Sequence, residues 1–388
     1  MRKINRMIII INIIMLISVV FCGCSYKSSD NIDTKINKNE KMIAFPSSSK
    51  YYTDPYYRNK VKWGFIDQTG KIIVKPQYDY ASNSSDGLAV VVVNGKKGYI
   101  NSNGNIVVKP QFEDALPFKD GVAKVFINGK IAYINKTGKL ILEPGYDILG
   151  NVSDGMILIC KNKKYGFADT NGNIVIKPKF SLASDFNDGL AAVGLKDKKK
   201  IYIDKKGNKV IDKGFIYTSD FSENLAVVKT KDTLGFIDTK GNLVAEPKVN
   251  VLNSFSSGLA SINVHNKWGY IDTKGNISIS PQYQFEGGFT ENLAPVEVNN
   301  KWGFINKKGD MVVKPQFKFI LSKLADGPIL VQKDSFTDKE YVDKAGKRIF
   351  KPHLKYADAF SNGLGLVSTD GVNFEYINAK GKIVFKLE

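Results

Sequence analysis

Short runs of alternating apolar and polar residues recur along the chain, and each run leads into a turn that contains a glycine. The turn glycines lie 34 to 37 residues apart, at Gly70, Gly104, Gly138, Gly172, Gly207, Gly241, Gly275, Gly309, Gly346 and Gly381. An Asp or Asn stands three residues before every one of them. This spacing is typical of a type I turn closed by a left-handed glycine. The pattern therefore predicts about ten copies of a β-hairpin.

Each copy is expected to form three strands. The strand before the turn carries an aromatic residue followed by an aliphatic one, as at Phe65 and Ile66, so both of its faces are predicted to be buried. The apolar second strand ends at a proline in eight copies, because proline lacks the N–H that a strand ladder uses. The third strand begins at Gly-Leu-Ala or a variant of it, as at Gly87. Six phenylalanines that precede third strands are expected to fill the gaps between copies: Phe118, Phe186, Phe221, Phe255, Phe289 and Phe360.

A three-stranded unit is too thin to bury both faces, so the copies must pack on one another. We therefore predict an all-β fold in which about ten tandem repeats of ~34 residues occupy residues 61–388. An open curved solenoid is the preferred arrangement, because the first copy lacks an obvious opening strand. A closed propeller-like ring is the alternative.

The repeated residues resemble the WG-repeat family, which is named for the Trp-Gly that stands here at Trp63, Trp268 and Trp302 with the glycines that follow them. The resemblance covers about residues 50–388. Several copies depart from the consensus, since Ala132, Ile201, Glu340 and Glu375 replace the glycine and Lys213 replaces the proline. The resemblance implies a bacterial, often exported repeat scaffold, and it adds no catalytic residue.

The N-terminal segment is predicted to direct export. Three basic residues precede the apolar run Met7–Phe21, which covers only ~22 Å as a helix and is too short for the ~30 Å core of a membrane. Residues 1–24 end in a sequence that resembles a lipobox, in which Cys24 would carry the lipid. Residues 25–60 are polar and are predicted to be a flexible tether. The protein is thus expected at the outer face of the cytoplasmic membrane.

Residues for catalysis or metal binding are scarce in the sequence. The chain has two histidines, His265 and His353, in separate copies, and Cys160 has no partner for a disulfide after processing. The Asp-x-Thr-x-Gly turns could suggest calcium, but four of the ten copies carry neutral Asn and no bidentate Glu follows. We predict no catalytic residues, no metal site and no cofactor.

The net charge of +18 falls to +15 when residues 1–23 are removed. Lysines recur beside the strand-ending proline and would form a row able to attract a polyanion, at Lys75, Lys109, Lys177, Lys314 and Lys351. A solvated lysine surface that protects strand edges is the alternative interpretation. The three tryptophans are interpreted as packing residues, with carbohydrate stacking as the alternative.

These features predict a lipid-anchored extracellular scaffold that binds a partner and does not catalyse a reaction. The partner would be an envelope protein or an anionic cell-wall polymer, and nucleic acid is not expected outside the cell. The alternatives are a polyanion- or glycan-binding cell-wall module and, last, an enzyme. The sequence does not specify the oligomeric state.

Overall fold

The computed structural model describes residues 41–195, 199–324, 327–333, 338–350 and 353–388, which belong to one compact unit, Lys35–Glu388. The predicted export segment, Cys24, residues 25–40 and Lys351 lie outside the described residues. No described helix is long and apolar enough to cross a membrane.

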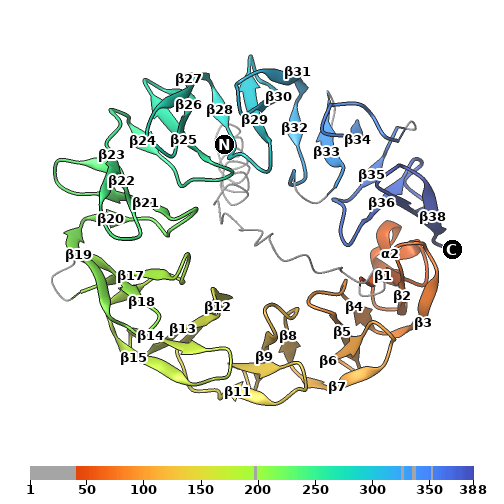
Figure 1. Ribbon diagram of the computed structural model, residues 1–388. Coiled ribbons are helices and arrows are strands. Elements are labelled where there is room, and N and C mark those ends of the chain that lie inside the picture. The colour runs from red at the N-terminus through yellow and green to blue at the C-terminus, as the bar shows by residue number, and fades with distance from the viewer. Residues whose placement is uncertain (1–40, 196–198, 325–326, 334–337, 351–352) are drawn as a thin grey trace, which may run out of the picture. The chain divides into compact units, whose positions relative to one another are not determined.

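The compact unit consists of ten small antiparallel sheets arranged in a ring, which we number as blades 1 to 10 along the chain (Figure 1). Blades 1 to 5 contain β1 (Ile43–Pro46), β2 (Trp63–Ile66) and β3 (Ile72–Tyr78); β4 (Tyr80–Ala81), β5 (Leu88–Val93), β6 (Lys96–Asn101) and β7 (Ile106–Phe112); β8 (Asp114–Ala115), β9 (Val122–Ile127), β10 (Lys130–Asn135) and β11 (Leu140–Leu142); β12 (Ile148–Ser153), β13 (Met156–Lys161), β14 (Lys164–Asp169) and β15 (Ile174–Phe180); β16 (Leu182–Ala183), β17 (Leu190–Gly194), β18 (Lys200–Asp204) and β19 (Lys209–Phe215).

Blades 6 to 10 repeat the same plan. They contain β20 (Tyr217–Thr218), β21 (Leu225–Lys229), β22 (Leu234–Asp238) and β23 (Leu243–Ala245); β24 (Val251–Leu252), β25 (Leu259–Val264), β26 (Lys267–Asp272) and β27 (Ile277–Tyr283); β28 (Phe285–Glu286), β29 (Leu293–Val298), β30 (Lys301–Asn306) and β31 (Met311–Phe317); β32 (Phe319–Ile320), β33 (Ile329–Gln332) and β34 (Lys339–Val342); β35 (Tyr356–Ala357), β36 (Leu364–Ser368), β37 (Glu375–Asn378) and β38 (Ile383–Lys386).

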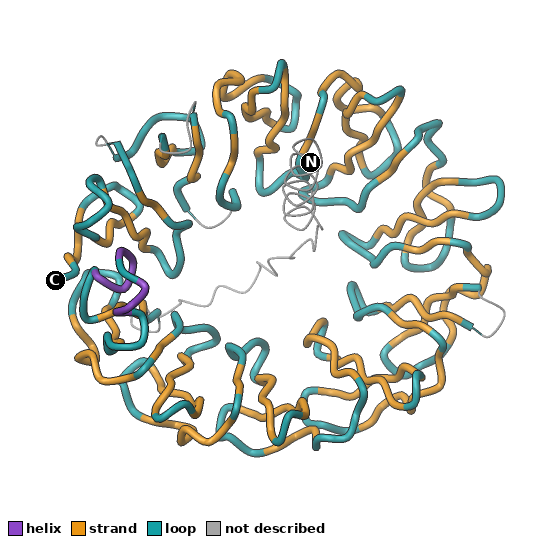
Figure 2. The backbone as a smooth tube through the Cα atoms, turned by 180° about the vertical axis from the view of Figure 1, so that it is seen from behind, coloured by secondary structure: helices purple, strands orange, loops and turns teal. Residues whose placement is uncertain are grey.

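The three predicted strands are present in most copies, and a fourth strand was not predicted. This strand, such as β4 or β8, lies on the inner side of its blade, toward the ring axis, whereas the strand that follows the glycine turn lies outermost (Figures 1 and 2). Two different turns join the three longer strands. Counted outward from the ring axis, the second and third strands of blade 2 are β5 and β6, and they meet at Asn94 and Gly95, which both have positive φ, as a type I′ hairpin turn requires. The third and fourth strands meet at the predicted Asp/Asn-x-x-Gly turn.

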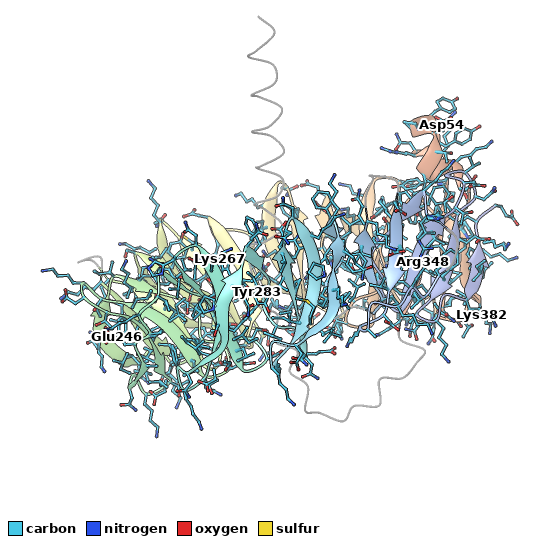
Figure 3. All side chains as sticks on the ribbon, turned by 90° about the horizontal axis from the view of Figure 1, so that it is seen from above. Asp54, Glu246, Lys267, Tyr283, Arg348 and Lys382 are labelled. Atoms are coloured by element: carbon cyan, nitrogen blue, oxygen red, sulfur yellow. The ribbon has the colours of Figure 1, made fainter. Side chains whose placement is uncertain are left out.

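The two kinds of turn define two faces of the ring. We call the face with turns such as Asn94-Gly95 the hairpin face, and the face with the Asp/Asn-x-x-Gly turns the turn face. The segment between β1 and β2 extends the hairpin face of blade 1 with α2 (Lys50–Thr53) and η2 (Pro55–Tyr57). In the side view of Figure 3, Asp54 of this segment rises above one face, and Lys382, in the last glycine turn, lies toward the opposite one.

The ring is closed, so the alternative architecture is confirmed and the preferred open solenoid is wrong. Ile43, Phe45 and Ile66 of blade 1 form one buried cluster with Leu364, Leu366 and Tyr376 of blade 10. The Asn362 side chain donates hydrogen bonds to the carbonyl oxygens of Met42 and Ser84, at 3.0 and 2.9 Å. The last blade therefore packs on the first, and each of them is built from a continuous stretch of chain.

The described part of the expected tether is folded, which corrects the prediction for residues 41–60. The run Met42–Phe45 is apolar and buried, and β1 pairs antiparallel with β2. This short run is the opening strand that the first copy was expected to lack. Ile43 and Phe45 gain burial against the last repeat, and Met42 and Ala44 gain it between blades 1 and 2, which a reading of the local sequence alone does not include.

Candidate binding face

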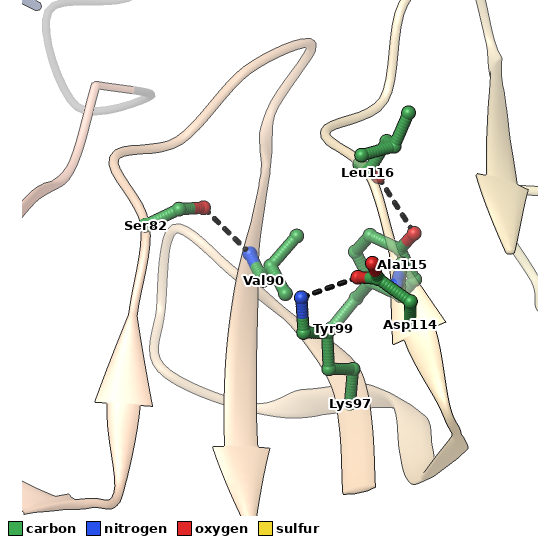
Figure 4. A network of polar contacts seen from close by, with 7 residues as sticks. All are labelled: Ser82, Val90, Lys97, Tyr99, Asp114, Ala115 and Leu116. Carbon is green, nitrogen blue, oxygen red and sulfur yellow. Dashed lines mark hydrogen bonds and ion pairs between the residues drawn. The ribbon is translucent and has the colours of Figure 1, made fainter. Parts of the chain in front are cut away.

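The inner strand of a blade contacts the third strand of the blade before it, as β8 contacts β6, and this contact positions the side chains of the hairpin face. Figure 4 shows the contact between blades 2 and 3, where Lys97 forms an ion pair with Asp114 and the Tyr99 hydroxyl donates to the carbonyl oxygen of Leu116 at 2.8 Å. Burial raises the pKa of Tyr99. Tyr202, Tyr270 and Tyr341 repeat the hydroxyl-to-carbonyl bond in other blades.

The predicted role of the six phenylalanines is confirmed by the rings that they contact. Tyr99 and Phe118 lie 4.7 Å apart between ring centroids, in an edge-to-face arrangement across a blade boundary. Equivalent pairs recur at five other boundaries: Phe167 with Phe186, Tyr202 with Phe221, Phe236 with Phe255, Tyr270 with Phe289 and Tyr341 with Phe360. Such pairs stabilise the contact beyond the area that they bury.

The first residue of most described inner strands is large, apolar and exposed. This set, which we call the inner circle, lies at the hairpin-face end of its strands, because Tyr80 pairs with Val92 beside the Asn94-Gly95 turn. Its members and their exposed fractions are Tyr80 (44%), Leu182 (48%), Tyr217 (49%), Val251 (40%) and Phe285 (60%). Asp114 occupies the same position in blade 3. The inner circle thus presents one exposed apolar side chain in each of five blades.

The tryptophans of the Trp-Gly pairs stand next to this inner circle. Trp63 contacts Tyr80 with 5.1 Å between ring centroids and is only 7% exposed, so the packing interpretation holds for this residue. Its Nε1 is buried without a hydrogen-bond partner. Trp268 and Trp302 are half-buried. The same pair of positions holds Lys97 with Asp114, so one contact is aromatic in one blade and ionic in another.

Lysine ammonium groups lie over aromatic rings at several places on the hairpin face. Lys200 lies 5.6 Å from the ring centroid of Tyr217, and Lys339 lies 5.6 Å from that of Tyr356. In the segment between β1 and β2, Lys60 lies 3.4 Å from the ring of the exposed Tyr56. Positive charge and aromatic surface are therefore combined on this face.

Sequence reasoning missed a second set of lysines, at the residue before the Trp-Gly position. Seven blades carry a lysine there, which we call the lysine circle: Lys62, Lys96, Lys130, Lys164, Lys199, Lys267 and Lys301. The other three blades hold Thr233, Asp338 and Asn373. All of these positions lie where the hairpin turn meets the third strand, so the lysine circle follows the hairpin face. The signal was visible in the repeat as the Lys of Lys-Trp-Gly.

The predicted lysine row lies elsewhere, on the outer circumference of the ring. Lys75, Lys109, Lys177 and Lys314 are exposed on the outermost strands β3, β7, β15 and β31. Each belongs to a different blade, and the equivalent positions of three intervening blades hold Glu143, Asp212 and Glu246. The row is therefore interrupted by negative charge.

Several carboxylates near the ring axis are partly removed from water. Burial raises the pKa of Asp185, which also feels the charge of Asp220, and burial raises the pKa of Glu286. The described residues contain no group of three or more His, Cys, Asp or Glu able to hold a metal ion. In the glycine turn of blade 4, Asp169 Oδ1 accepts the backbone N–H groups of Asn171 and Asn173, at 2.9 and 2.8 Å, which accounts for the repeated Asp by turn geometry.

Cys160 is buried on β13, and burial raises the pKa of its thiol. A shallow hollow of about 470 Å³ opens between blades 8 and 9 and is lined by Leu293, Val312 and Leu324, with the ion-paired Glu291 and Lys344 at its side. Neither feature brings together an acid, a base and a nucleophile.

A family model described as "WG containing repeat" matches nine segments of the chain, at residues 63–96, 98–130, 132–165, 165–198, 202–233, 235–268, 268–302, 302–335 and 341–372. The comparison with curated proteins gives no match.

Similar solved structures have low identity to the chain. A eukaryotic initiation factor is 12% identical, with a TM-score of 0.45, over 89% of this chain and 95% of its own. BamB from Moraxella catarrhalis is 12% identical, with a TM-score of 0.35, over 79% and 96%. The WD40 β propeller domain of Doa1 is 13% identical, with a TM-score of 0.28, over 58% and 92%. All three scores are below 0.5, so no argument rests on these similarities.

Proposed function

The chain belongs to the family of WG-containing repeats, and on that premise we propose that it is a binding scaffold, held at the outer face of the bacterial cytoplasmic membrane by a lipid on Cys24. The observation that carries the proposal is the hairpin face. Repeated positions there present exposed apolar and basic side chains around a closed ring. A surface of this kind suits the recognition of an extended or repeating partner.

The course of β1 supports this arrangement. Ile43 pairs with Ile66, which precedes the turn face, and Pro46 pairs with Trp63 at the hairpin face. The chain therefore enters the ring from the turn face. Sixteen tether residues, 25–40, would have a root-mean-square span of about 20–24 Å if they are flexible. A lipid anchor attached through this tether would leave the hairpin face directed away from the membrane.

Cell fractionation with metabolic lipid labelling tests the anchor. We expect the full-length protein to carry the label and to need detergent for release from the membrane fraction. Cys24→Ala should remove the label, and Cys22→Ala is the matched control that should keep it. Labelled Cys24→Ala, or wild-type protein recovered in the cytosol, would show that the anchor proposal is wrong.

An enzyme remains the last of the candidate functions. The argument against it is that the carboxylates with raised pKa, such as Asp185 and Glu286, lie on different blades and are partnered by structural hydrogen bonds and charges. A repeat scaffold with many equivalent positions spreads an interaction over several blades. A catalytic centre would instead concentrate it on a few residues.

A further inference from the structure

We infer that the hairpin face binds an acidic polysaccharide, with sugar rings on the inner circle and carboxylate or phosphate groups near the lysine circle. This inference rests on the proposed binding function and names the class of partner. The two circles lie on the same face and repeat from blade to blade, so a polymer whose sugars and acidic groups also repeat would meet the same pair of features several times.

The charge of the hairpin face favours an anionic partner. Among the ten equivalent positions of the lysine circle, seven are lysine and one is acidic. Ion pairs occur on both faces: Lys62 of the lysine circle pairs with Asp79, and on the turn face Lys136 pairs with Asp86 and Lys205 with Asp154. A face of one dominant sign raises the local concentration of a ligand of the opposite sign.

The inner circle favours a ligand that also has an apolar surface. Tyr217 and Phe285 are about half exposed or more at the axis side of the lysine circle. The flat faces of sugar rings carry C–H groups that pack on aromatic rings, whereas a simple polyanion offers nothing for these side chains to bury. The combination of rings and lysines therefore points to acidic sugars rather than to phosphate chains or acidic peptides.

Binding of three soluble polymers to the full chain in detergent micelles tests the inference. Polygalacturonate carries sugar rings and carboxylates, polyglutamate carries carboxylates alone, and dextran carries sugars without charge. We expect polygalacturonate to bind most tightly, polyglutamate to bind at least about tenfold more weakly, a difference of ~1.4 kcal/mol, and dextran not to bind. Raising the salt concentration should weaken binding of polygalacturonate, because exposed charges are screened.

Two sets of substitutions separate the contributions. Tyr217→Ala with Phe285→Ala should weaken polygalacturonate binding about tenfold and leave polyglutamate binding unchanged. Lys96→Gln, Lys130→Gln and Lys267→Gln together should weaken the binding of both polymers. These five side chains are exposed, so the fold should be retained, and circular dichroism checks this.

Two matched triple variants remove the same number of lysines from other surfaces. Lys75→Gln, Lys109→Gln and Lys177→Gln alter the outer circumference, and Lys240→Gln, Lys274→Gln and Lys382→Gln alter the turn face. Both should bind polygalacturonate like the wild type. Equal losses in all three triple variants would show that net charge alone is responsible and would overturn the inference.

The remaining outcomes are also decisive. Equal affinity for polyglutamate and polygalacturonate would identify a general polyanion surface and contradict the sugar specificity. The absence of binding to any polymer at low salt would overturn the inference, while a lipid label lost in Cys24→Ala would still support the proposed anchored scaffold. Failure of the inference and failure of the proposed function are therefore distinguishable.

Discussion

Two physical reasons exclude a β-carbon at the turn glycines. Gly70 has a φ of +87°, which side chains disfavour, and a β-carbon there would lie 2.0 Å from the carbonyl oxygen of Val384 in the last blade. Eight of the other nine turn glycines also face the outermost strand of the blade before them, as Gly104 faces Val74, and Gly381 faces Ile349 of blade 9. One small residue per repeat therefore sets both the turn and the distance between blades.

Gly70→Ala is expected to destabilise the protein more than Gly121→Ala. Gly121 has a similar φ of +84°, but no atom lies within 4 Å of the position of its β-carbon. Both variants lose about 1–2 kcal/mol from backbone strain, and Gly70→Ala should lose about 1–3 kcal/mol more from overpacking against blade 10. Urea denaturation measures the difference. Equal unfolding midpoints would contradict the close approach at the ring closure.

The Glu286 carboxyl group gives a pH-dependent prediction. Burial raises its pKa, despite hydrogen bonds from Ser261, Tyr270 and Asn253 that lower it. The native state therefore holds this proton at a pH where the unfolded chain has released it, so its contribution to stability is present at low pH and is lost as the pH rises through the raised pKa.

Glu286→Gln should match the wild type in stability near pH 4 and exceed it at pH 7, because an amide carries no charge to desolvate. Glu143 is exposed and directly follows the outermost strand β11. Glu143→Gln is therefore the control and should change the stability of the protein little. Denaturation midpoints measured from pH 4 to pH 8 test this. A wild-type protein that gains stability over the variant as the pH rises would show the opposite sign and contradict the argument.

At the scale of elements, β1 shows how a strand of four residues stabilises a ring of ten blades. Ile43 is buried between β2 of its own blade and Leu364 and Tyr376 of blade 10. Ile43→Ala should cost about 2–4 kcal/mol, because it leaves a cavity at the closing contact. Ile277→Ala removes an exposed isoleucine from an outermost strand and should cost less than about 0.5 kcal/mol.

Hydrogen exchange would locate the effect of Ile43→Ala. We expect faster exchange in β1, β2 and β36 to β38, on the two sides of the closing contact, and little change in blades 4 to 7. Uniformly faster exchange in all blades would instead mean that the ring unfolds as a single cooperative unit.

The sequence predicted those elements whose signal is local. The ten glycine turns, the alternating strand around Phe65 and the phenylalanines between copies are each specified by neighbours in the chain. The inner strands have only two residues in most blades, too few to show a period. The closed ring was predicted only as the alternative, because the partners of Ile43 in blade 10 lie more than 300 residues away.

For the candidate site, the sequence predicted the types of side chain but not their positions on the ring. Positive charge and aromatic side chains were both identified, but the lysines chosen, such as Lys75, belong to the outermost strand. Periodicity shows that lysine recurs at equivalent positions of several copies, whereas it does not show which end of a strand faces the aromatic side chains of the next blade. That information came from strand pairing, which places Lys96 at the hairpin turn.

At the scale of the whole molecule, closure makes every blade an internal one. Each blade covers two neighbours, so no terminal repeat has to carry a polar capping face. The contacts between blades 10 and 1 are of the same kinds as those elsewhere in the ring: a turn glycine against an outer strand, a buried apolar cluster and a tyrosine hydroxyl that donates to a carbonyl, here from Tyr376 to Ala44 at 3.1 Å.

Removing residues 355–388 should therefore disrupt the fold rather than shorten it. The deletion uncovers the apolar side chains of Ile43 and Phe45 in blade 1 and of Leu330 and Phe350 in blade 9. Exposed apolar surface of this kind promotes association. We expect the shortened chain to aggregate in size-exclusion chromatography and to unfold at a lower urea concentration.

A circular permutant is the control for cutting the chain without removing a blade. New ends at Tyr78 and Asp79, with a linker of about twelve residues from Glu388 to Lys41, keep all ten blade contacts; such a linker reaches ~40 Å, enough to pass from one face of the ring to the other. The permutant should stay monomeric and retain most of its stability. A monomeric, stable protein lacking residues 355–388 would mean that blades 1 and 9 tolerate uncovered faces, as in an open solenoid, and that closure contributes little to the stability of the fold.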